Sequence, residues 1–273
     1  MKKFISTILG LILLLSLTAC GNTAQSTSNN KNSESSKPLS KEEFQQMYSN
    51  PDKFKGKTVD FYARVFGEPE KDGEGTYLQA WLNPKDSSNN IIIAINDAKL
   101  DVKRDNIIHV VGVVEKKYEG KNAFGATITA PVIKASKIEK TDYTTAFDPA
   151  IKTVDLNKEI DQQGYVMKIS KVEFSKENTR VYLSITNNSK ERFNFYKYNS
   201  NAVQGSKQLK LKDNYEQKLP DIKTEILPGV KEEGVLNFEP MDVNGENVKI
   251  ILEGTSQNYE LKLDPYSFEV PLK

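Results

Sequence analysis

Period-two alternation of apolar and polar residues narrows the fold of this 273-residue sequence more than any other feature. In residues 58–66 four alternate positions are apolar: Val59, Phe61, Ala63 and Val65. Successive side chains on a strand point to opposite faces, so such a run has one face for a core and one for solvent. Further β-rich runs lie at residues 77–82, 91–95, 107–115 and 126–138. The sequence therefore predicts an all-β protein.

One short helix is expected in front of these strands. Ser40 is followed three residues later by Glu43, which is the spacing of a capping box. Three residues then share one helical face: Phe44, Met47 and Tyr48. The pattern predicts a helix over residues 41–48 that ends before Pro51.

A motif after this helix carries a resemblance to a known fold. The pattern (N)P-x-x-F-x-G-K-x-V starts at residue 50, and the fourth of the five strands that follow contains a glycine, IIHVVGVVE. This arrangement resembles small bacterial OB-fold domains, especially those similar to the tRNA-anticodon-binding type. The chain has Lys103-Arg104-Asp105-Asn106 where these domains commonly have Lys-Gly-Asp. The resemblance implies a five-stranded OB-like barrel over residues 39–140, with ligands on strands two and three.

A candidate ligand site follows from this resemblance. Three aromatic residues on or beside the expected ligand face are Tyr77, Trp81 and Tyr118. They are candidates for a platform on which a sugar or a peptide stacks. The alternative is that Trp81 belongs to the core, as a lone tryptophan in an apolar strand more often does. The loop at residues 67–75 is acidic, which argues against an oligonucleotide ligand.

Short strands separated by turns also fill the second half of the chain, residues 157–273. They are expected at residues 163–174, 179–187, 192–198, 201–204, 208–211, 222–226, 233–238, 248–252 and 259–263. This spacing is typical of a β-sandwich. In residues 192–198, RFNFYKY, the phenylalanines are expected on one side and Tyr196 and Tyr198 on the other. These tyrosines are either half covered or form an exposed recognition stripe.

Two motifs in this half carry a second resemblance. Val-x-Leu-x-Ile-x-Asn-Asn-Ser begins at Val181, and ILPGVKEEGVLNFEP begins at Ile226. The match rests on Leu227-Pro228-Gly229, Gly234 and Phe238. The motifs resemble immunoglobulin-like domains of unknown function in Gram-positive lipoproteins, which are similar to the immunoprotective extracellular protein superfamily. The resemblance implies an exported immunoglobulin-like β-sandwich, and it implies no established activity.

The start of the chain reads as a secretory signal. Lys2 and Lys3 precede an apolar run, residues 4–17, that is shorter than the roughly 20 residues of a membrane-spanning helix. The run leads into Leu17-Thr18-Ala19-Cys20, which resembles the lipobox of bacterial lipoproteins. The resemblance implies that residues 1–19 are removed and that Cys20 carries a lipid. The alternative is an ordinary secretory signal with an incidental cysteine.

Two segments lack the alternation of the strands. Residues 20–38 are almost wholly Ser, Asn, Thr, Gln and Lys, which predicts a disordered tether with a span of roughly 25 Å. Residues 141–156 contain Pro149 and several small polar residues, and they are the expected linker between the two domains.

Charge and residue counts argue against several functions. Without Lys2 and Lys3 the mature chain has 36 Lys and Arg against 37 Asp and Glu, so nucleic acid is not an expected partner. The chain has one histidine, His109, and one cysteine. These are too few ligands for a zinc or copper site, and they do not suggest a nucleophile that is activated by a histidine base. The segments 72–74 and 242–246 are expected as hairpin turns rather than calcium loops. No catalytic residue, metal ligand or cofactor is assigned.

These observations predict a lipoprotein anchored through Cys20 to the extracellular face of the cell membrane. The expected function is non-enzymatic binding of an envelope protein, a wall polymer or a small extracellular ligand. The alternative is a carboxylate-dependent hydrolase or a transport accessory lipoprotein, because Asp and Glu are numerous.

Overall fold

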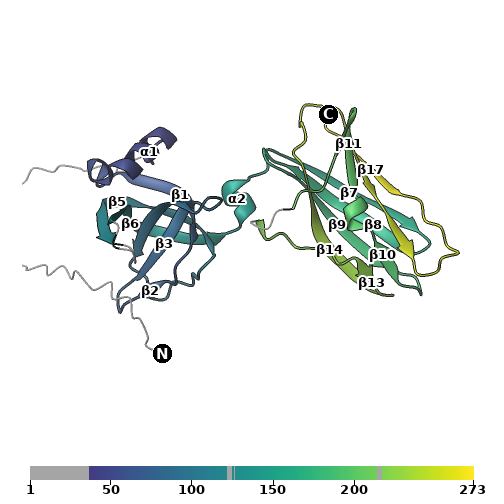
Figure 1. Ribbon diagram of the computed structural model, residues 1–273, viewed down its shortest axis with the longest axis horizontal. Helices are drawn as coiled ribbons and strands as arrows, with labels where there is room; N and C mark the ends of the chain where they lie inside the picture. The colour runs from purple at the N-terminus through teal and green to yellow at the C-terminus, as the bar shows by residue number, and fades with distance from the viewer. Residues whose placement is uncertain (1–36, 122–124, 126, 214–216) are drawn as a thin grey trace, which may run out of the picture. The chain divides into compact units, whose positions relative to one another are not determined.

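The structure is a computed structural model that describes residues 37–121, 125, 127–213 and 217–273. The expected signal peptide, Cys20 and the tether up to residue 36 lie outside these residues. In the described ranges no helix is long and apolar enough to cross a membrane. The described chain contains a barrel and a sandwich (Figure 1), each with its own hydrophobic core.

The first part is a closed five-stranded barrel. Its strands are β1 (Thr58–Val65), β3 (Thr76–Asn83), β4 (Ser88–Ile95), β5 (Ile107–Lys121) and β6 (Thr127–Thr141), with the short β2 (Glu70–Lys71) beside β3. The strand order is β1-β5-β6-β4-β3, and the barrel closes because β1 also pairs with β3. β4 and β6 are parallel, and the other pairs are antiparallel. The expected OB-like barrel is confirmed.

The alternation in β1 explains how the barrel is filled. Its four inward residues, Val59, Phe61, Ala63 and Val65, are buried. They join inward residues of the other strands, such as Leu78, Ile93 and Ile108, in one core. Full burial of an aliphatic side chain contributes about 1.5–3 kcal/mol, so the pattern selects the face that points inward.

The pairing of β5 with β6 contains two irregularities. The register shifts between Val111 and Gly112 and again between Val114 and Lys116. Such bulges bend a strand and increase its twist, which helps a sheet to close. A Cβ atom at Gly112 would lie 2.5 Å from the carbonyl oxygen of Lys134. The close approach of the two backbones therefore requires glycine there.

The expected helix is α1 (Lys41–Ser49), and the short 3-10 helix η1 (Pro51–Phe54) follows it. The capping box is formed, with Glu43 N donating to Ser40 Oγ at 3.2 Å and Ser40 N donating to Glu43 Oε2 at 2.8 Å. Met47 is fully buried among the barrel residues. Because a nine-residue helix is marginal alone, this packing holds α1 in place.

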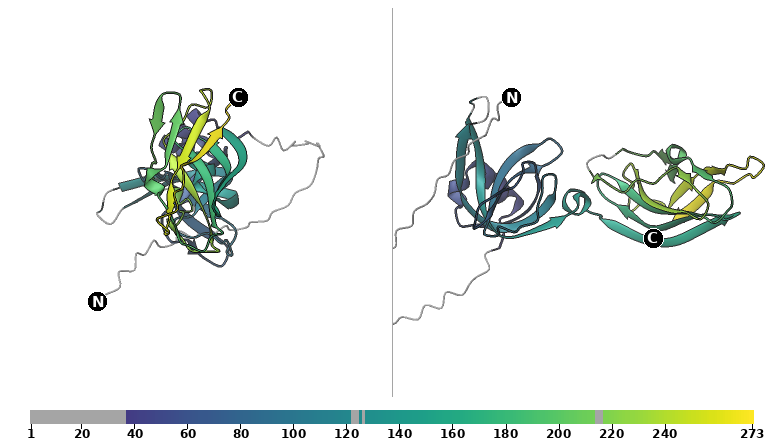
Figure 2. Two further views of the ribbon diagram at one scale, coloured as in Figure 1. Left: turned by 90° about the vertical axis from the view of Figure 1, so that its right-hand side faces the viewer. Right: turned by 90° about the horizontal axis from the view of Figure 1, so that it is seen from below.

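The second part is a two-layered sandwich (Figure 2). One sheet has the order β14-β9-β8-β7, and the opposite layer contains the sheets β12-β11-β15-β17 and β13-β10-β16. The first sheet consists of β7 (Lys152–Gln162), β8 (Tyr165–Phe174), β9 (Thr179–Asn187) and β14 (Lys231–Phe238). The other strands are β10 (Phe193–Phe195), β11 (Asn201–Gln204), β12 (Lys207–Leu209), β13 (Glu225–Ile226), β15 (Val248–Leu252), β16 (Gly254–Ser256) and β17 (Tyr266–Val270). Residues of both layers meet in one core, which confirms the expected β-sandwich.

Two predictions for the second part are wrong. Residues 259–263 form no strand, and the C-terminal strand is β17 instead. Both segments alternate, but Tyr259 is 88% exposed whereas Tyr266 and Phe268 are buried in the core. Residues 192–198 form a strand only to Phe195, after which the 3-10 helix η2 (Lys197–Asn199) begins.

The expected linker is largely structured. It contains the helix α2 (Tyr143–Phe147), which is capped by Asp142 Oδ1 accepting from Thr145 N at 2.7 Å. Strand β7 then begins at Lys152, earlier than the predicted domain start at residue 157. Sequence alone did not indicate β7 because it is an edge strand with many charged and exposed side chains.

Candidate functional site

The structure places the predicted aromatic residues on the outside of the barrel. Tyr77 and Trp81 are on the outer face of β3, and Tyr77 is 44% exposed. The Trp81 ring stacks on Phe66, with ring centroids 4.6 Å apart and an angle of 20° between the planes. Trp81 is therefore half-buried against the outside of the barrel and does not fill its core.

Each of the three predicted residues has its own local contacts. Tyr77 donates a hydrogen bond from its hydroxyl to Asp72 Oδ2 at 3.0 Å, and this bond raises the pKa of Tyr77. Tyr118 lies on β5, where it pairs with Ala130 of β6, and its hydroxyl is beside Gly120 of the same strand. Among the described residues the ring partner of Trp81 is Phe66, not either tyrosine.

A concave surface lies between α1 and the barrel, and we name it the helix–barrel hollow. Its volume is about 620 Å³. It is lined by Leu39, Lys41, Phe44, Gln45, Tyr48, Asp60, Phe61, Leu82 and Asn89. An apolar and aromatic lining with a few polar groups is the usual composition of a small-ligand site.

Local structure fixes the aromatic wall of this hollow. The capping box sets the start of α1, and this places Phe44 against Phe61 of β1 with ring centroids 5.3 Å apart. Tyr48 is one turn further along the same helical face. Burial raises the pKa of Tyr48, so its hydroxyl stays protonated and neutral near pH 7. Leu39 N donates to Thr58 O at 3.0 Å, which ties the chain before the helix to β1.

The polar groups of the hollow come from separate elements. Lys41 and Gln45 are on α1, Asp60 is on β1, and Asn89 is on β4. Asp60 Oδ1 lies 2.6 Å from His109 Nε2, and the His109 ring packs at 4.8 Å from the ring of Tyr62. The hollow thus presents one cationic and one anionic side chain beside its aromatic wall.

Sequence reasoning missed both the hollow and the carboxylate beside His109. Residues 60 and 109 are 49 positions apart, and they meet because β1 and β5 are neighbours in the barrel. The helical face of Phe44 and Tyr48 was the available signal, but a helical face alone does not show whether it fills a core or borders a hollow. His109 does not line the hollow, so the pair orients Asp60 from outside it.

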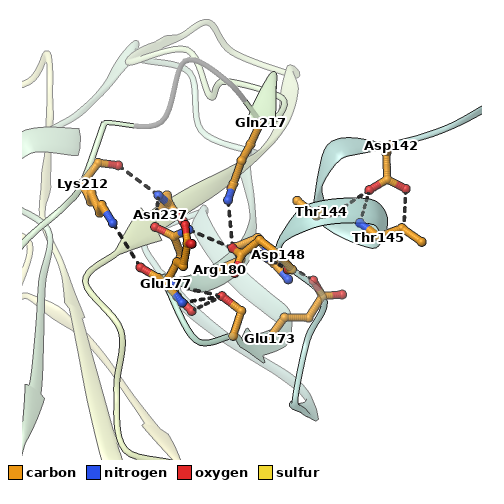
Figure 3. A network of polar contacts seen from close by, with 12 residues as sticks. Asp142, Thr144, Thr145, Asp148, Glu173, Glu177, Arg180, Lys212, Gln217 and Asn237 are labelled. Carbon is orange, nitrogen blue, oxygen red and sulfur yellow. Dashed lines mark hydrogen bonds and ion pairs between the residues drawn. The ribbon is translucent and has the colours of Figure 1, made fainter. Parts of the chain in front are cut away.

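A second cluster of polar groups lies on β8 and β9 of the sandwich, on the sheet face opposite the core residues (Figure 3). Arg180 is 1% exposed and donates from Nη1 to Asp148 Oδ2 at 2.9 Å and from Nε to Glu173 Oε2 at 3.1 Å. Asp148 Oδ2 also accepts from Asn178 at 2.8 Å and from Gln217 at 2.9 Å. Arg180 and Asp148 are buried, and the charges of the cluster are paired with each other, so the cluster is a poor candidate for a ligand site.

Glu173 is the more accessible member of this cluster. Burial by itself raises the pKa of Glu173, but hydrogen bonds from Lys171, Tyr182 and Arg180 outweigh it and hold that pKa below its usual value. Burial, together with the hydrogen bond to Glu173, raises the pKa of Tyr182 to about 12. The carboxylate is therefore ionised and the phenol protonated at neutral pH.

Comparisons with known proteins give one weak structural similarity to report. No protein family matches the chain, and no curated protein matches it. Among solved structures, the chain is similar to a functionally unknown protein from Listeria monocytogenes EGD-e, with 13% sequence identity and a TM-score of 0.35. The similarity covers 46% of this chain and 88% of that chain. The comparisons assign no family to this protein.

Proposed function

We propose that this protein is a lipoprotein on the extracellular face of the cell membrane and that it binds a ligand without chemical conversion. The ligand site is the helix–barrel hollow. The residues from α1 and from the barrel that line it supply an aromatic wall, and Asp60 and Lys41 supply opposite charges at its sides. The ligand therefore carries an apolar or aromatic group together with polar atoms.

The observation that supports this site is its size together with its lining. A volume of about 620 Å³ lies within the range of about 300–1,000 Å³ that small-ligand pockets occupy. A hydrolase that used two carboxylates would need both acids to face the substrate. The hollow is lined by the single carboxylate of Asp60, so binding is the better supported function for it.

A substitution at the mouth of the hollow tests the site. Gln45 is exposed on α1 and lines the hollow, so Gln45→Trp fills its mouth without entering the core. The matched control is Gln46→Trp, the next residue on α1, which does not line the hollow. The probe is 8-anilinonaphthalene-1-sulfonate, whose fluorescence rises in an apolar site. We expect saturable binding that Gln45→Trp weakens about tenfold and Gln46→Trp leaves unchanged. Equal effects of the two substitutions would exclude the hollow as the site.

The lipid anchor is tested separately. Two acyl chains are needed for stable anchoring, since one holds a protein only marginally, and a cysteine sulfur can carry a diacylglyceryl group. Intact-mass analysis of the natural protein from its membrane should show a chain that starts at Cys20 and carries lipid. An uncleaved leader or a free thiol at Cys20 would contradict the anchor without affecting the hollow.

A further inference from the structure

The exposed aromatic side chains of the sandwich include two at a single turn. Tyr196 and Tyr198 are 44% and 80% exposed, and they flank Lys197 where β10 passes through η2 into β11. We name residues 196–199 the tyrosine turn. Of the two alternatives that the sequence left open, half-covered tyrosines or an exposed stripe on a strand, the stripe is not formed, because the strand ends at Phe195.

Hydrogen bonds hold the tyrosine turn in one conformation. Tyr196 N donates to Glu253 O at 2.9 Å, and Asn199 N donates to Tyr196 O at 2.9 Å. The Asn199 side chain donates to Glu253 Oε2 at 3.3 Å, and Lys197 forms an ion pair with Asp221. A ring displayed on a fixed backbone loses little conformational entropy when a ligand stacks on it.

Two hollows adjoin the turn and share Lys197 and Tyr198. Their volumes are about 370 Å³ and about 330 Å³. The first is lined by Tyr196, Asn199 and Thr224 among others, which combine an aromatic ring with an amide and a hydroxyl group. Two adjacent hollows on one exposed ring suit a ligand that consists of repeated units.

A buried acceptor borders the second hollow. Asn237 lines it and is only 7% exposed. Its amide nitrogen donates to Asn178 Oδ1 and to Lys212 O, both at 3.1 Å, whereas its Oδ1 has no hydrogen-bond partner in the described part of the chain. Buried acceptors are normally satisfied, so this atom is an exception among the described residues, and because it is buried it is not itself a contact for a ligand in the hollow.

The surroundings exclude two other kinds of ligand. β10 already pairs with β13 on one side and β16 on the other, so no backbone is free for a peptide strand to add there. The charged residues that line the second hollow are three lysines and two aspartates, which is too balanced for a polyanion. A neutral ligand with hydroxyl groups and apolar C–H faces fits both observations. We propose that the tyrosine turn binds a neutral glycan chain.

This site is separate from the helix–barrel hollow and does not rest on the function proposed for it. Its test uses the full chain purified in a detergent without a sugar headgroup. The probes are cellohexaose and chitohexaose, which share a β-1,4-linked backbone and differ in the acetamido group, and binding is measured by calorimetry. We expect at least one oligosaccharide to bind, with the same affinity at low and high salt.

Matched substitutions then locate the site. We expect Tyr198→Ala to weaken oligosaccharide binding about tenfold or more, because truncation of a central aromatic contact has effects of this size. Tyr259→Ala removes a similarly exposed tyrosine elsewhere in the sandwich and should leave the oligosaccharide affinity unchanged. Gln45→Trp in the barrel should also leave this affinity unchanged. The proposal is overturned if neither oligosaccharide binds, if Tyr198→Ala and Tyr259→Ala act alike, or if heparin displaces the sugar.

Discussion

Arg180 is the largest fully buried side chain in the described part of the protein. A buried charge is tolerated only where it is paired and hydrogen-bonded, and Asp148 and Glu173 meet this need. Asp148 is 32 positions away in the sequence and directly follows α2, so the cluster also fixes the chain that enters the sandwich. At this scale, polar contacts of Asp148 help to hold that segment in place.

Loss of the arginine should destabilise the sandwich strongly. We expect Arg180→Ala to lower the free energy of unfolding by about 3–5 kcal/mol, because it leaves Asp148 buried without its cation. Arg192→Ala is the matched control, since Arg192 forms an exposed ion pair with Glu225 that contributes about 0–1 kcal/mol. Urea denaturation measures both values. Similar losses for the two variants would show that the buried pair has no special role.

Glu173 should make stability depend on pH. Its pKa is lower in the folded protein than in the unfolded chain, so its contribution is complete above the unfolded pKa of about 4.3 and is lost as pH falls through the folded pKa. We expect Glu173→Gln to lower the free energy of unfolding at pH 7 by about 1–3 kcal/mol. The difference from the wild type should shrink as the pH is lowered below about 4. A difference that stays constant over this range would contradict the assignment.

At the scale of elements, the pairing of β5 with β6 depends on a bulge as well as on alternation. Each strand has 15 residues, and the register shifts once between Val111 and Gly112 and again between Val114 and Lys116. A one-residue slip would move every side chain to the opposite face. The glycine is therefore a structural requirement of the barrel.

Gly112→Ala should destabilise the barrel. The added methyl group would meet the Lys134 carbonyl oxygen at 2.5 Å, and backbone atoms cannot move aside cheaply. We expect a loss of about 1–3 kcal/mol in the free energy of unfolding. Gly73→Ala is the control, because a Cβ atom there meets nothing within 4 Å. An unchanged denaturation midpoint for Gly112→Ala would show that the strands shift without cost.

At the scale of the whole molecule, the described chain has two separate hydrophobic cores. The buried members of one lie between Met47 and Ala135, and those of the other lie between Tyr165 and Leu272. No buried residue belongs to both clusters. Each part of the described chain therefore has its own apolar driving force for folding.

Calorimetry should detect these cores as two transitions. Ile108 belongs to the barrel core and Phe268 to the sandwich core, and both are almost fully buried. We expect Ile108→Ala and Phe268→Ala each to lower the midpoint of a different transition by about 10–25 °C, since such truncations cost about 2–5 kcal/mol. A single transition that both substitutions shift alike would show that the two parts unfold together.

The sequence by itself determined the all-β class, the helix α1 and most strands of the barrel. Alternation and the capping box are local patterns, and each was sufficient because burial of an apolar face is the dominant favourable term in folding. The edge strand β7 was missed because its many charged residues resemble those of a loop. The strand β17 was missed because the alternating run at residues 259–263 has the pattern of a strand.

Only the tertiary structure decided which side chains meet. The lining of the helix–barrel hollow, the contact of Asp60 with His109 and the pairing of Arg180 with Asp148 all join residues that are far apart in the sequence. Such contacts depend on strand neighbours and register, and no local pattern encodes them. The same reason explains why Tyr77, Trp81 and Tyr118 were recognised as aromatic candidates, whereas the stacking of Trp81 on Phe66 was not foreseen.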